Sequence, residues 1–297
     1  MVTSEGERLL TRWITIAAAL LQPIFAAQTG SIQSVPQAGD AYEITRDSKS
    51  SWRSSEGSSG NSTDRDTIIE RIVAVREAGV ELEYDLPKNA AGKGRPGNWQ
   101  FPARVFRPFH GPPQLLNGRE LEARADSWLK AAGLSRAACG RWVFTWNAFR
   151  IECDPQSVIQ MIEPFDLRSV DLRDGAPYQE RGTRGPVPLR KTVGSGGTAF
   201  VAEMTIDPDA ARRDLAQSDV AAAEINQETL TFDAALRARA REDISGTVVT
   251  AFDSDPAGQA HRRRKVTTLE IRGAGGRLET RTTTEIVERR AASQLDP

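Results

Sequence analysis

The sequence predicts an α+β protein built mainly of antiparallel β-sheet, with hairpins, a C-terminal meander and about three short helices. Apolar and polar residues alternate in several segments, as in VELEYDLP at 80–87. Turn-forming sequences separate these segments, for example DSDPAG at 253–258, which we interpret as a Pro-Gly hairpin loop rather than a calcium loop. Apolar residues at helical spacing occur only in short stretches that follow N-cap residues.

Residues 1–27 are expected to form a signal peptide. The apolar run at 13–27 is shorter than the roughly 20 residues of a membrane span and matches the hydrophobic region of a leader. Pro23 precedes small residues, so cleavage is expected after Ala26 or Ala27. An uncleaved N-terminal anchor is the alternative. The mature chain is then expected to be periplasmic or secreted in a Gram-negative bacterium, with no transmembrane span.

Cys139 and Cys153 are the only cysteines, and an exported protein favours pairing them. The segment between them is symmetric, and a loop at 145–147 would place Val143 opposite Phe149. The same register brings the two cysteines opposite each other, whereas one continuous strand would keep them too far apart. The sequence therefore predicts a disulfide-bonded hairpin, with two buried free thiols as the alternative.

Residues 28–65 are rich in Ser and Gly. We expect a strand around Ala41–Arg46, followed by a mobile loop or a long polar edge rather than a functional site.

Residues 66–87, at the start of the next region, 66–165, should form a hairpin in which Val75 lies opposite Leu82. In this hairpin Val80, Leu82 and Tyr84 face the core. The acidic side chains share the other face, where they form either a cation or acid/base site or a solvated strand face; they are Glu81, Glu83 and Asp85.

The rest of region 66–165 should hold a core. A helix is expected from a capping box at Asn117 to Gly133, and a second, short helix after Asp154-Pro155. Aromatic side chains in the cysteine hairpin form either a surface for sugars or apolar ligands or a core of large residues; they are Trp142, Phe144 and Trp146.

The C-terminal region, 166–297, either continues that domain or forms a separate one. Its expected elements are a strand at TAFVAEMTI, a helix from Asp207 to about Glu224, and strands at 229–241, 246–253 and 264–288. In the last of these, Ile271 should lie opposite Leu278 across a turn at 273–276.

Arginines alternate along the expected strand at 229–241 and would therefore share one face. With a second basic run they form either an anion-binding surface or a salt-bridged exposed face; the residues are Arg237, Arg239, Arg241, Arg262 and Arg263.

The composition excludes several function classes. A formal net charge of −1 is not typical of nucleic-acid-binding proteins. No local metal site is expected, because the two histidines, His110 and His261, are far apart in the sequence, and no cofactor motif is present. No catalytic motif occurs either, so a hydrolase would depend on the carboxylates and His110.

The hairpin ISGTVVTAFDSDPAGQ and the segment ELEYDLP resemble uncharacterised exported β-rich proteins of Gram-negative bacteria. This resemblance covers under half of the chain and implies a compartment but no activity. The resulting hypothesis is a non-enzymatic envelope protein that binds an anionic lipid, a glycan or a partner protein through β-sheet surfaces. A periplasmic hydrolase is the alternative.

Overall fold

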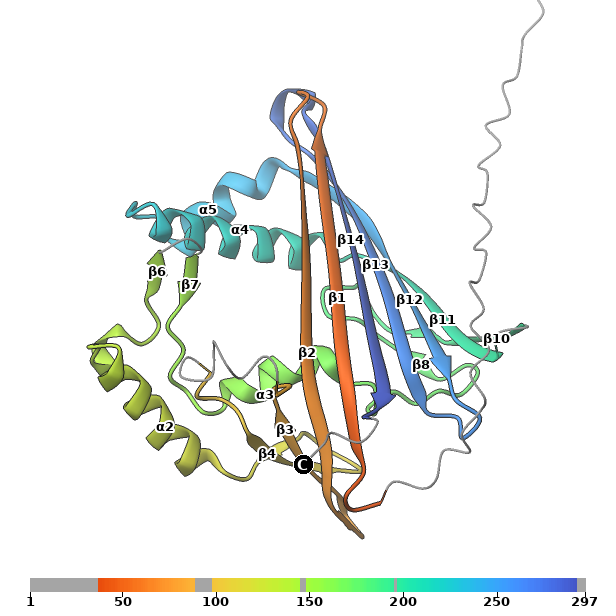
Figure 1. Cartoon of the computed structure of the whole chain (residues 1–297). Coiled ribbons are helices and arrows are strands. Elements are labelled where there is room, and N and C mark those ends of the chain that lie inside the picture. Colours follow the sequence, from red (N-terminus) through yellow and green to blue (C-terminus); the bar gives the residue numbers. More distant parts are fainter. Residues whose placement is uncertain (1–36, 89–97, 145–147, 195–196, 293–297) are drawn as a thin grey trace, which may run out of the picture. The chain divides into compact units, whose positions relative to one another are not determined.

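The computed structural model describes residues 37–88, 98–144, 148–194 and 197–292. Its main feature is a ten-stranded sheet with the order β10-β11-β12-β13-β14-β1-β2-β3-β4-β5, in which all paired strands are antiparallel (Figure 1). The predicted α+β class, mainly antiparallel sheet with short helices, is confirmed. Strands from all three regions expected after residue 27 pair in this one sheet.

The strands of the large sheet are β1 (Ala41–Ser54), β2 (Ser59–Arg76), β3 (Gly79–Asp85), β4 (Ala103–Pro108), β5 (Gln114–Leu115), β10 (Arg190–Gly194), β11 (Gly197–Thr205), β12 (Asp243–Ser254), β13 (Ala260–Arg272) and β14 (Leu278–Ala291). Two small hairpins are formed by β6 (Trp142–Phe144) with β7 (Ala148–Arg150), and by β8 (Pro177–Tyr178) with β9 (Val187–Pro188). The α-helices of the described residues are α2 (Gly118–Ala131), α3 (Ser157–Ile162), α4 (Pro208–Ile225) and α5 (Phe232–Ala238).

The Ser- and Gly-rich segment forms the long hairpin β1–β2, so the expectation of a loop or polar edge after Arg46 is wrong. Both strands lie in the middle of the sheet, where β1 pairs with β14 from Tyr42 to Ser54 and with β2 from Ala41 to Arg53. Backbone hydrogen bonds on both sides hold β1 in place, and they do not depend on apolar side chains. The paired partners lie far away in the sequence, which local composition does not reveal.

The hairpin β2–β3 has a different register from the expected one. Val75 pairs with Val80 rather than Leu82, and the register shifts between Ile72 and Ala74, which leaves Val73 as a bulge. A bulge adds one residue to one strand, and a regular alternation cannot show it. The predicted core face is nevertheless right, because Val80, Leu82 and Tyr84 are buried.

Three helices lie close to their predicted positions. Helix α2 follows Asn117 and is ended by Gly133, which has a positive φ of 68°. The expected capping box is absent, because the Asn117 side-chain oxygen accepts a hydrogen bond from the Arg104 backbone N–H at 2.9 Å instead. Asn117 therefore joins the helix to β4. Helix α4 begins as predicted at Pro208, and the Asp207 side chain caps it.

The expected strand at 229–241 is wrong, because helix α5 and a single 3-10 turn at Arg239–Arg241 occupy it. The Thr231 hydroxyl accepts a hydrogen bond from the Ala234 backbone N–H and caps the helix. Ala, Leu and Arg are strong helix formers, so local propensity outweighs the alternation on which the strand was predicted. The rest of the expected meander is present as β12–β13–β14. Its register differs by one residue from the expected one, because Leu278 pairs with Arg272 and not with Ile271.

The cysteine hairpin is confirmed. Val143 pairs with Phe149, and the neighbouring rungs are also those expected from the sequence. Cys139 and Cys153 form a disulfide with their Cα atoms 5.7 Å apart. Cys153 is buried against Leu129 of α2, so the disulfide ties the hairpin to the helix.

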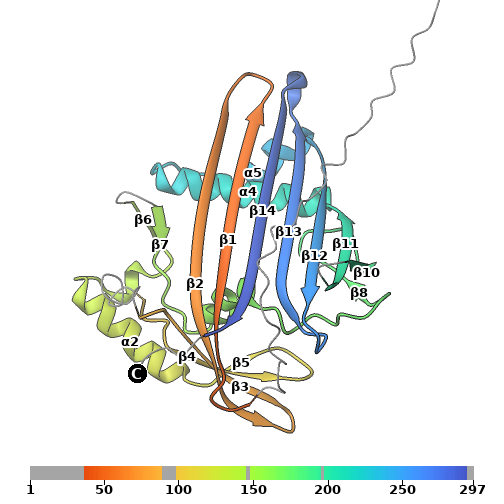
Figure 2. The same cartoon turned by 45° about the vertical axis from the view of Figure 1, so that its right-hand side comes forward.

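The main core lies on one face of the sheet, which we call the inner face. Inner side chains such as Ile44, Leu82 and Phe252 pack in one cluster with Leu121 of α2 and Val158 of α3. Figures 1 and 2 show α4 and α5 on the same side of the sheet. Each fully buried large apolar side chain stabilises the fold by about 1.5–3 kcal/mol.

Candidate functional site

The inner face becomes polar halfway along its three central strands. The register and the alternation of side chains define the inner residues between Ser48 and the β1–β2 turn. We call them the polar strip, and Trp52 is the only large apolar side chain among them. The polar strip consists of Ser48, Ser50, Trp52 and Ser54 of β1, Gly60, Ser62 and Asp64 of β2, and Glu279, Arg281, Thr283 and Glu285 of β14.

One end of the polar strip is an ion cluster around Glu285, which is 5% exposed. Its carboxylate accepts hydrogen bonds from Arg46 Nε at 2.8 Å and from Arg263 at 2.9 Å, and Lys265 Nζ lies 3.4 Å away. Burial alone would raise the pKa of Glu285, but Lys265, Arg46 and Arg263 outweigh it and hold that pKa below its ordinary value. The cluster is therefore ionised and already paired.

A second buried cluster surrounds Glu70, deeper in the core. Arg168 and Arg289 donate to Glu70 Oε1 at 3.0 and 3.1 Å, and the Tyr84 hydroxyl donates to Oε2 at 3.2 Å. The Arg289 guanidinium also lies 3.3 Å from the centre of the Tyr42 ring. Burial by itself would raise the pKa of Glu70, but the two arginines hold it below its ordinary value. With Glu70 2% exposed, this cluster is a structural element of the core.

These lowered pKa values predict a loss of stability in acid. Because the folded pKa of Glu70 and Glu285 lies below the unfolded value, the stabilisation is complete above about pH 4.3 and is lost as the pH falls through the folded values. We therefore expect the melting temperature to be nearly constant from pH 7 to about 5 and to fall below about 4. Thermal unfolding followed by circular dichroism at each pH measures this, and a melting temperature that rises towards pH 3 would contradict the assignment.

At the other end of the polar strip, Trp52 lies against the neighbouring strand. A Cβ atom added to Gly60 would come within 2.4 Å of the indole Nε1, so glycine is needed for the ring to lie where it does. The Trp52 side chain is left partly uncovered, with 39% of the residue exposed. Two residues before Trp52 on β1, the Ser50 hydroxyl lies 3.0 Å from the hydroxyl of Thr283 on β14 and shares a hydrogen bond with it.

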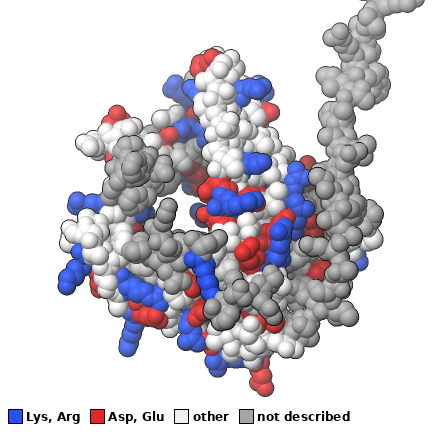
Figure 3. All heavy atoms as spheres, viewed as in Figure 1, with Lys and Arg blue, Asp and Glu red and all other residues white. Residues whose placement is uncertain are grey.

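A hollow of about 520 Å³ opens beside this tryptophan, and we call it the first hollow. Its volume falls within the range of about 300–1,000 Å³ that is typical of ligand sites. Its lining combines one aromatic ring with hydroxyl, guanidinium and carboxylate groups, from Ser50, Ser51, Trp52, Ser58, Arg277, Glu279, Arg281 and Thr283. On the face shown in Figure 3, acidic and basic side chains are interleaved.

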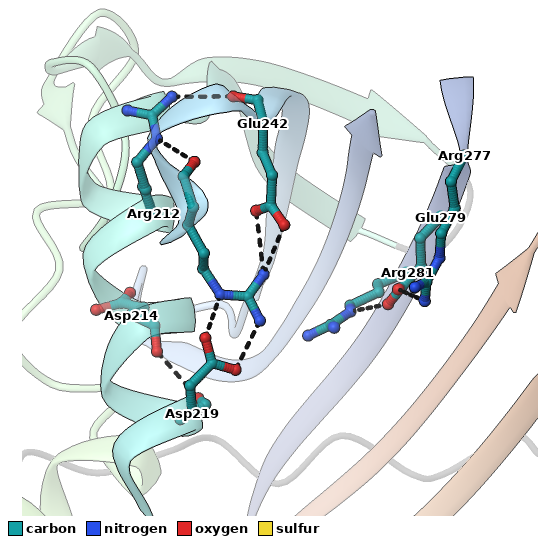
Figure 4. Close-up of polar contacts among 9 residues, drawn as sticks. Arg212, Asp214, Asp219, Glu242, Arg277, Glu279 and Arg281 are labelled. Atoms are coloured by element: carbon teal, nitrogen blue, oxygen red, sulfur yellow. Dashed lines mark hydrogen bonds and ion pairs between the residues drawn. The ribbon is translucent and has the colours of Figure 1, made fainter. Parts of the chain in front are cut away.

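A second hollow, of about 320 Å³, lies between α4 and the inner face of β12, β13 and β14. Arg281 lines both hollows. Figure 4 shows its side chain extending from β14 towards α4. The polar members of this lining are Glu180, Arg181, Asp214, Ser218, Lys265, Thr267 and Arg281, and the apolar ones are Ile206, Ala211, Leu215, Val248 and Leu269.

An arginine network holds α4 beside the sheet (Figure 4). Arg239 donates to Asp219 of α4 and to Glu242, at 2.7 and 3.0 Å, and these hydrogen bonds raise its pKa although burial opposes this. Arg212 of α4 donates to the Glu242 backbone carbonyl at 3.2 Å. Helix α4, one wall of the second hollow, is therefore fixed to the start of β12.

The arginines predicted to bind anions do not form one surface. Arg239 is paired inside the network just described, and Arg237 and Arg241 lie in α5 and in the 3-10 turn after it rather than on a strand. Arg263 faces inward and is 11% exposed, whereas Arg262, its neighbour on the strand, pairs with Glu288 and Asp253 on the outer face. The anion-binding prediction assumed that these arginines share one face of a strand, and the helix at this position rules out that arrangement. Anion binding by these arginines stays a prediction.

The other residues that the sequence predicted as sites do not come together in one place. Trp142 is half-buried in β6, the Phe144 side chain and Trp146 lie outside the described residues, and the aromatic surface stays a prediction. Glu81 is buried and pairs with Arg76 at 2.9 Å and with Arg104, so it serves as a structural anion. The side chain of His110 is exposed in the loop after β4 and makes no hydrogen bond or ion pair with any residue in the described part of the chain.

Sequence reasoning missed Trp52 and Arg281. The only local signal was Trp52 standing at two-residue spacing from Ser48 and Ser50 in a Ser-rich segment. Arg281 faces Trp52 across β1 and β14, which are more than 200 residues apart in the sequence.

No helix among the described residues is long and apolar enough to span a membrane, and the same residues contain no cluster of potential metal ligands. No protein family and no curated protein matches the sequence. One solved structure that is similar, reported as "Lipid-protein interactions in lipovitellin", is 11% identical, with a TM-score of 0.35. The match covers 88% of this chain and 26% of that one, so the chain spans about a quarter of the lipovitellin chain. A similarity at this level carries no functional conclusion.

Proposed function

We propose that the protein is an exported, non-enzymatic binding protein that holds a saccharide in the first hollow. The observation that carries the proposal is Trp52, a partly exposed aromatic ring placed against Gly60 and surrounded by polar groups. The face of an aromatic ring is electron-rich and attracts the weakly positive C–H groups of a pyranose ring. A sugar stacked on the indole would have its hydroxyls beside hydrogen-bonding side chains.

The lining favours a saccharide over a lipid chain. An acyl chain needs a wall of apolar side chains, and Trp52 is the only large apolar side chain among the described residues that line the first hollow. Serine and threonine hydroxyls both donate and accept hydrogen bonds, as sugar hydroxyls do, and arginine and glutamate add charged partners. Of the three ligand classes considered from the sequence, a glycan therefore fits this hollow best.

Export of the chain is part of the proposal. The disulfide between Cys139 and Cys153 supports it, because such bonds persist in oxidising compartments such as the periplasm. A protein of the cell envelope would meet polysaccharides in that compartment. The proposal assigns no catalytic group, since the hydrogen-bonding side chains around Trp52 are suited to holding a ligand.

Replacing Trp52 with Ala should weaken saccharide binding about tenfold or more, corresponding to about 1.4 kcal/mol or more. The wild-type chain is screened on a panel of neutral and acidic oligosaccharides, and the affinities of the members that bind are measured by isothermal titration calorimetry. Trp52→Phe keeps an aromatic face and should retain most of the affinity. Gly60→Ala should weaken binding because the new Cβ displaces the indole.

Phe109→Ala is the matched control, because Phe109 is an aromatic residue with 60% of its surface exposed and does not line the hollow. Its affinity for the same oligosaccharides should equal that of the wild type. The proposal is overturned if the wild-type protein binds no member of the panel, or if Trp52→Ala binds as tightly as the wild type.

A further inference from the structure

Arg281 connects the two hollows of the inner face. Among the described residues it is the one that lines both, and its side chain extends from β14 towards α4 (Figure 4). The other described lining residues of the first hollow come from β1, the β1–β2 turn and the first half of β14 with the residue before it. Those of the second come from α4, β12, β13 and the segments that carry residues 180–182 and Ile206. A single elongated ligand that passes Arg281 would therefore contact both sets of residues.

The guanidinium of Arg281 is only partly used by the protein. Its Nε donates to Glu279 at 2.5 Å, and the two terminal nitrogens make no hydrogen bond with any residue that the structure describes. The side chain is 42% exposed. Two free N–H groups side by side match the two oxygens of a carboxylate, which is the geometry that guanidinium binds best.

Among the lining residues that the structure describes, basic groups outnumber carboxylates by one in each hollow, with Arg281 counted in both. In the first, Arg277 and Arg281 share Glu279, and Arg277 Nε also lies 3.6 Å from Glu56 Oε2, so Arg281 is the less fully paired of the two arginines. In the second, Lys265 is paired with Glu180 and Glu285, whereas Arg181 has no ion-pair partner among the described residues. The chain as a whole has a net charge of −1, so this local excess does not follow from the composition.

We infer that the ligand is an acidic oligosaccharide, a chain of uronate sugars, that lies across both hollows with a carboxylate on Arg281. This inference rests on the proposed saccharide function and adds the charge and the length of the ligand. One sugar stacks on Trp52, the next carboxylate pairs with Arg281, and later sugars reach Arg181 and the hydroxyls of Thr267 and Ser218. Asp214 accepts hydrogen bonds from sugar hydroxyls in the second hollow.

The charge of the ligand is tested with galacturonate, mannuronate and guluronate hexamers, each paired with its methyl ester, which keeps the chain and removes the charge. The wild type should bind at least one acidic hexamer about tenfold to a hundredfold more tightly than the ester, and Arg281→Gln should lose this difference. Added salt should weaken binding of the acidic form and not of the ester. Arg53→Gln, an exposed arginine one residue from Trp52 but on the outer face, is the control and should bind as the wild type does.

The length of the ligand is tested with the disaccharide of the hexamer that binds. Arg181→Gln should weaken binding of the hexamer and leave the disaccharide unchanged, because only the hexamer reaches the second hollow. Equal effects on both lengths, or none, would overturn the spanning arrangement. Equal affinity for acid and ester, or binding of neutral panel members alone, would overturn the acidic ligand and leave saccharide binding in place. Absence of binding to every saccharide would remove the proposed function as well.

Discussion

Replacing Glu70 with Ala is expected to lower the free energy of unfolding by about 3–5 kcal/mol. The change removes the carboxylate that accepts from both Arg168 and Arg289, and it leaves two guanidinium groups in a buried environment with one fewer anion. Arg289 is 8% exposed and cannot easily reach water. Urea unfolding followed by circular dichroism, with the disulfide intact, measures the difference.

Two further variants separate the causes of this loss. Glu70→Gln keeps the shape of the side chain and removes its charge, so it should lose most of the same free energy. Glu43→Ala is the control: Glu43 is exposed on β1, a neighbouring strand, and its replacement should change stability by less than about 0.5 kcal/mol. A loss below about 1 kcal/mol for Glu70→Ala would show that the buried ion cluster does not stabilise the fold.

Local patterns predicted the elements whose determinants are close in the sequence. The cysteine hairpin was predicted rung by rung, because its symmetric sequence and the disulfide geometry leave one register. The start of α4 at Pro208 was also predicted correctly, because Asp followed by Pro is typical of the first residues of a helix. The core face of β3 followed from alternation alone, which specifies the face even where the register shifts.

The wrong expectations have two physical causes. Alternating arginines are compatible with a strand and with a helix. The helix α5 forms because Thr231 caps its N-terminus and because alanine has a high helix propensity. The Ser-rich strand β1 has too few apolar side chains to be recognised locally. It forms because its backbone pairs with β14 and β2, and β14 lies at the other end of the chain.

The candidate site could not be read from the sequence for the same reason. Trp52 faces Arg281 only because β1 and β14 pair, and Gly60 provides room for the ring only because β2 pairs on the other side. The second hollow adds residues of α4 that approach the sheet through tertiary packing. Long-range strand pairing therefore assembles the site from residues that are individually unremarkable.

Replacing Phe252 with Ala should also be severely destabilising, by about 3–5 kcal/mol, because a large cavity replaces a fully buried ring. Phe252 is 0% exposed, and its ring meets that of Tyr178 edge to face, with the centroids 5.2 Å apart. Phe252→Leu keeps most of the volume and should lose distinctly less. Urea unfolding of the three proteins measures the series.

The same substitution should affect the second hollow more than the first. Phe252 supports Tyr178, whose hydroxyl donates to Glu180 at 2.5 Å, and Glu180 lines the second hollow and lies 3.8 Å from Lys265. In native conditions, loosening Tyr178 should therefore weaken binding of an acidic hexamer while leaving the disaccharide on Trp52 unchanged. The exposed Phe109→Ala control should change neither stability nor affinity. Stability of Phe252→Ala within about 1 kcal/mol of the wild type would contradict the packing of this side of the core, because a buried phenylalanine cannot be removed at so small a cost without collapse of the surrounding sheet.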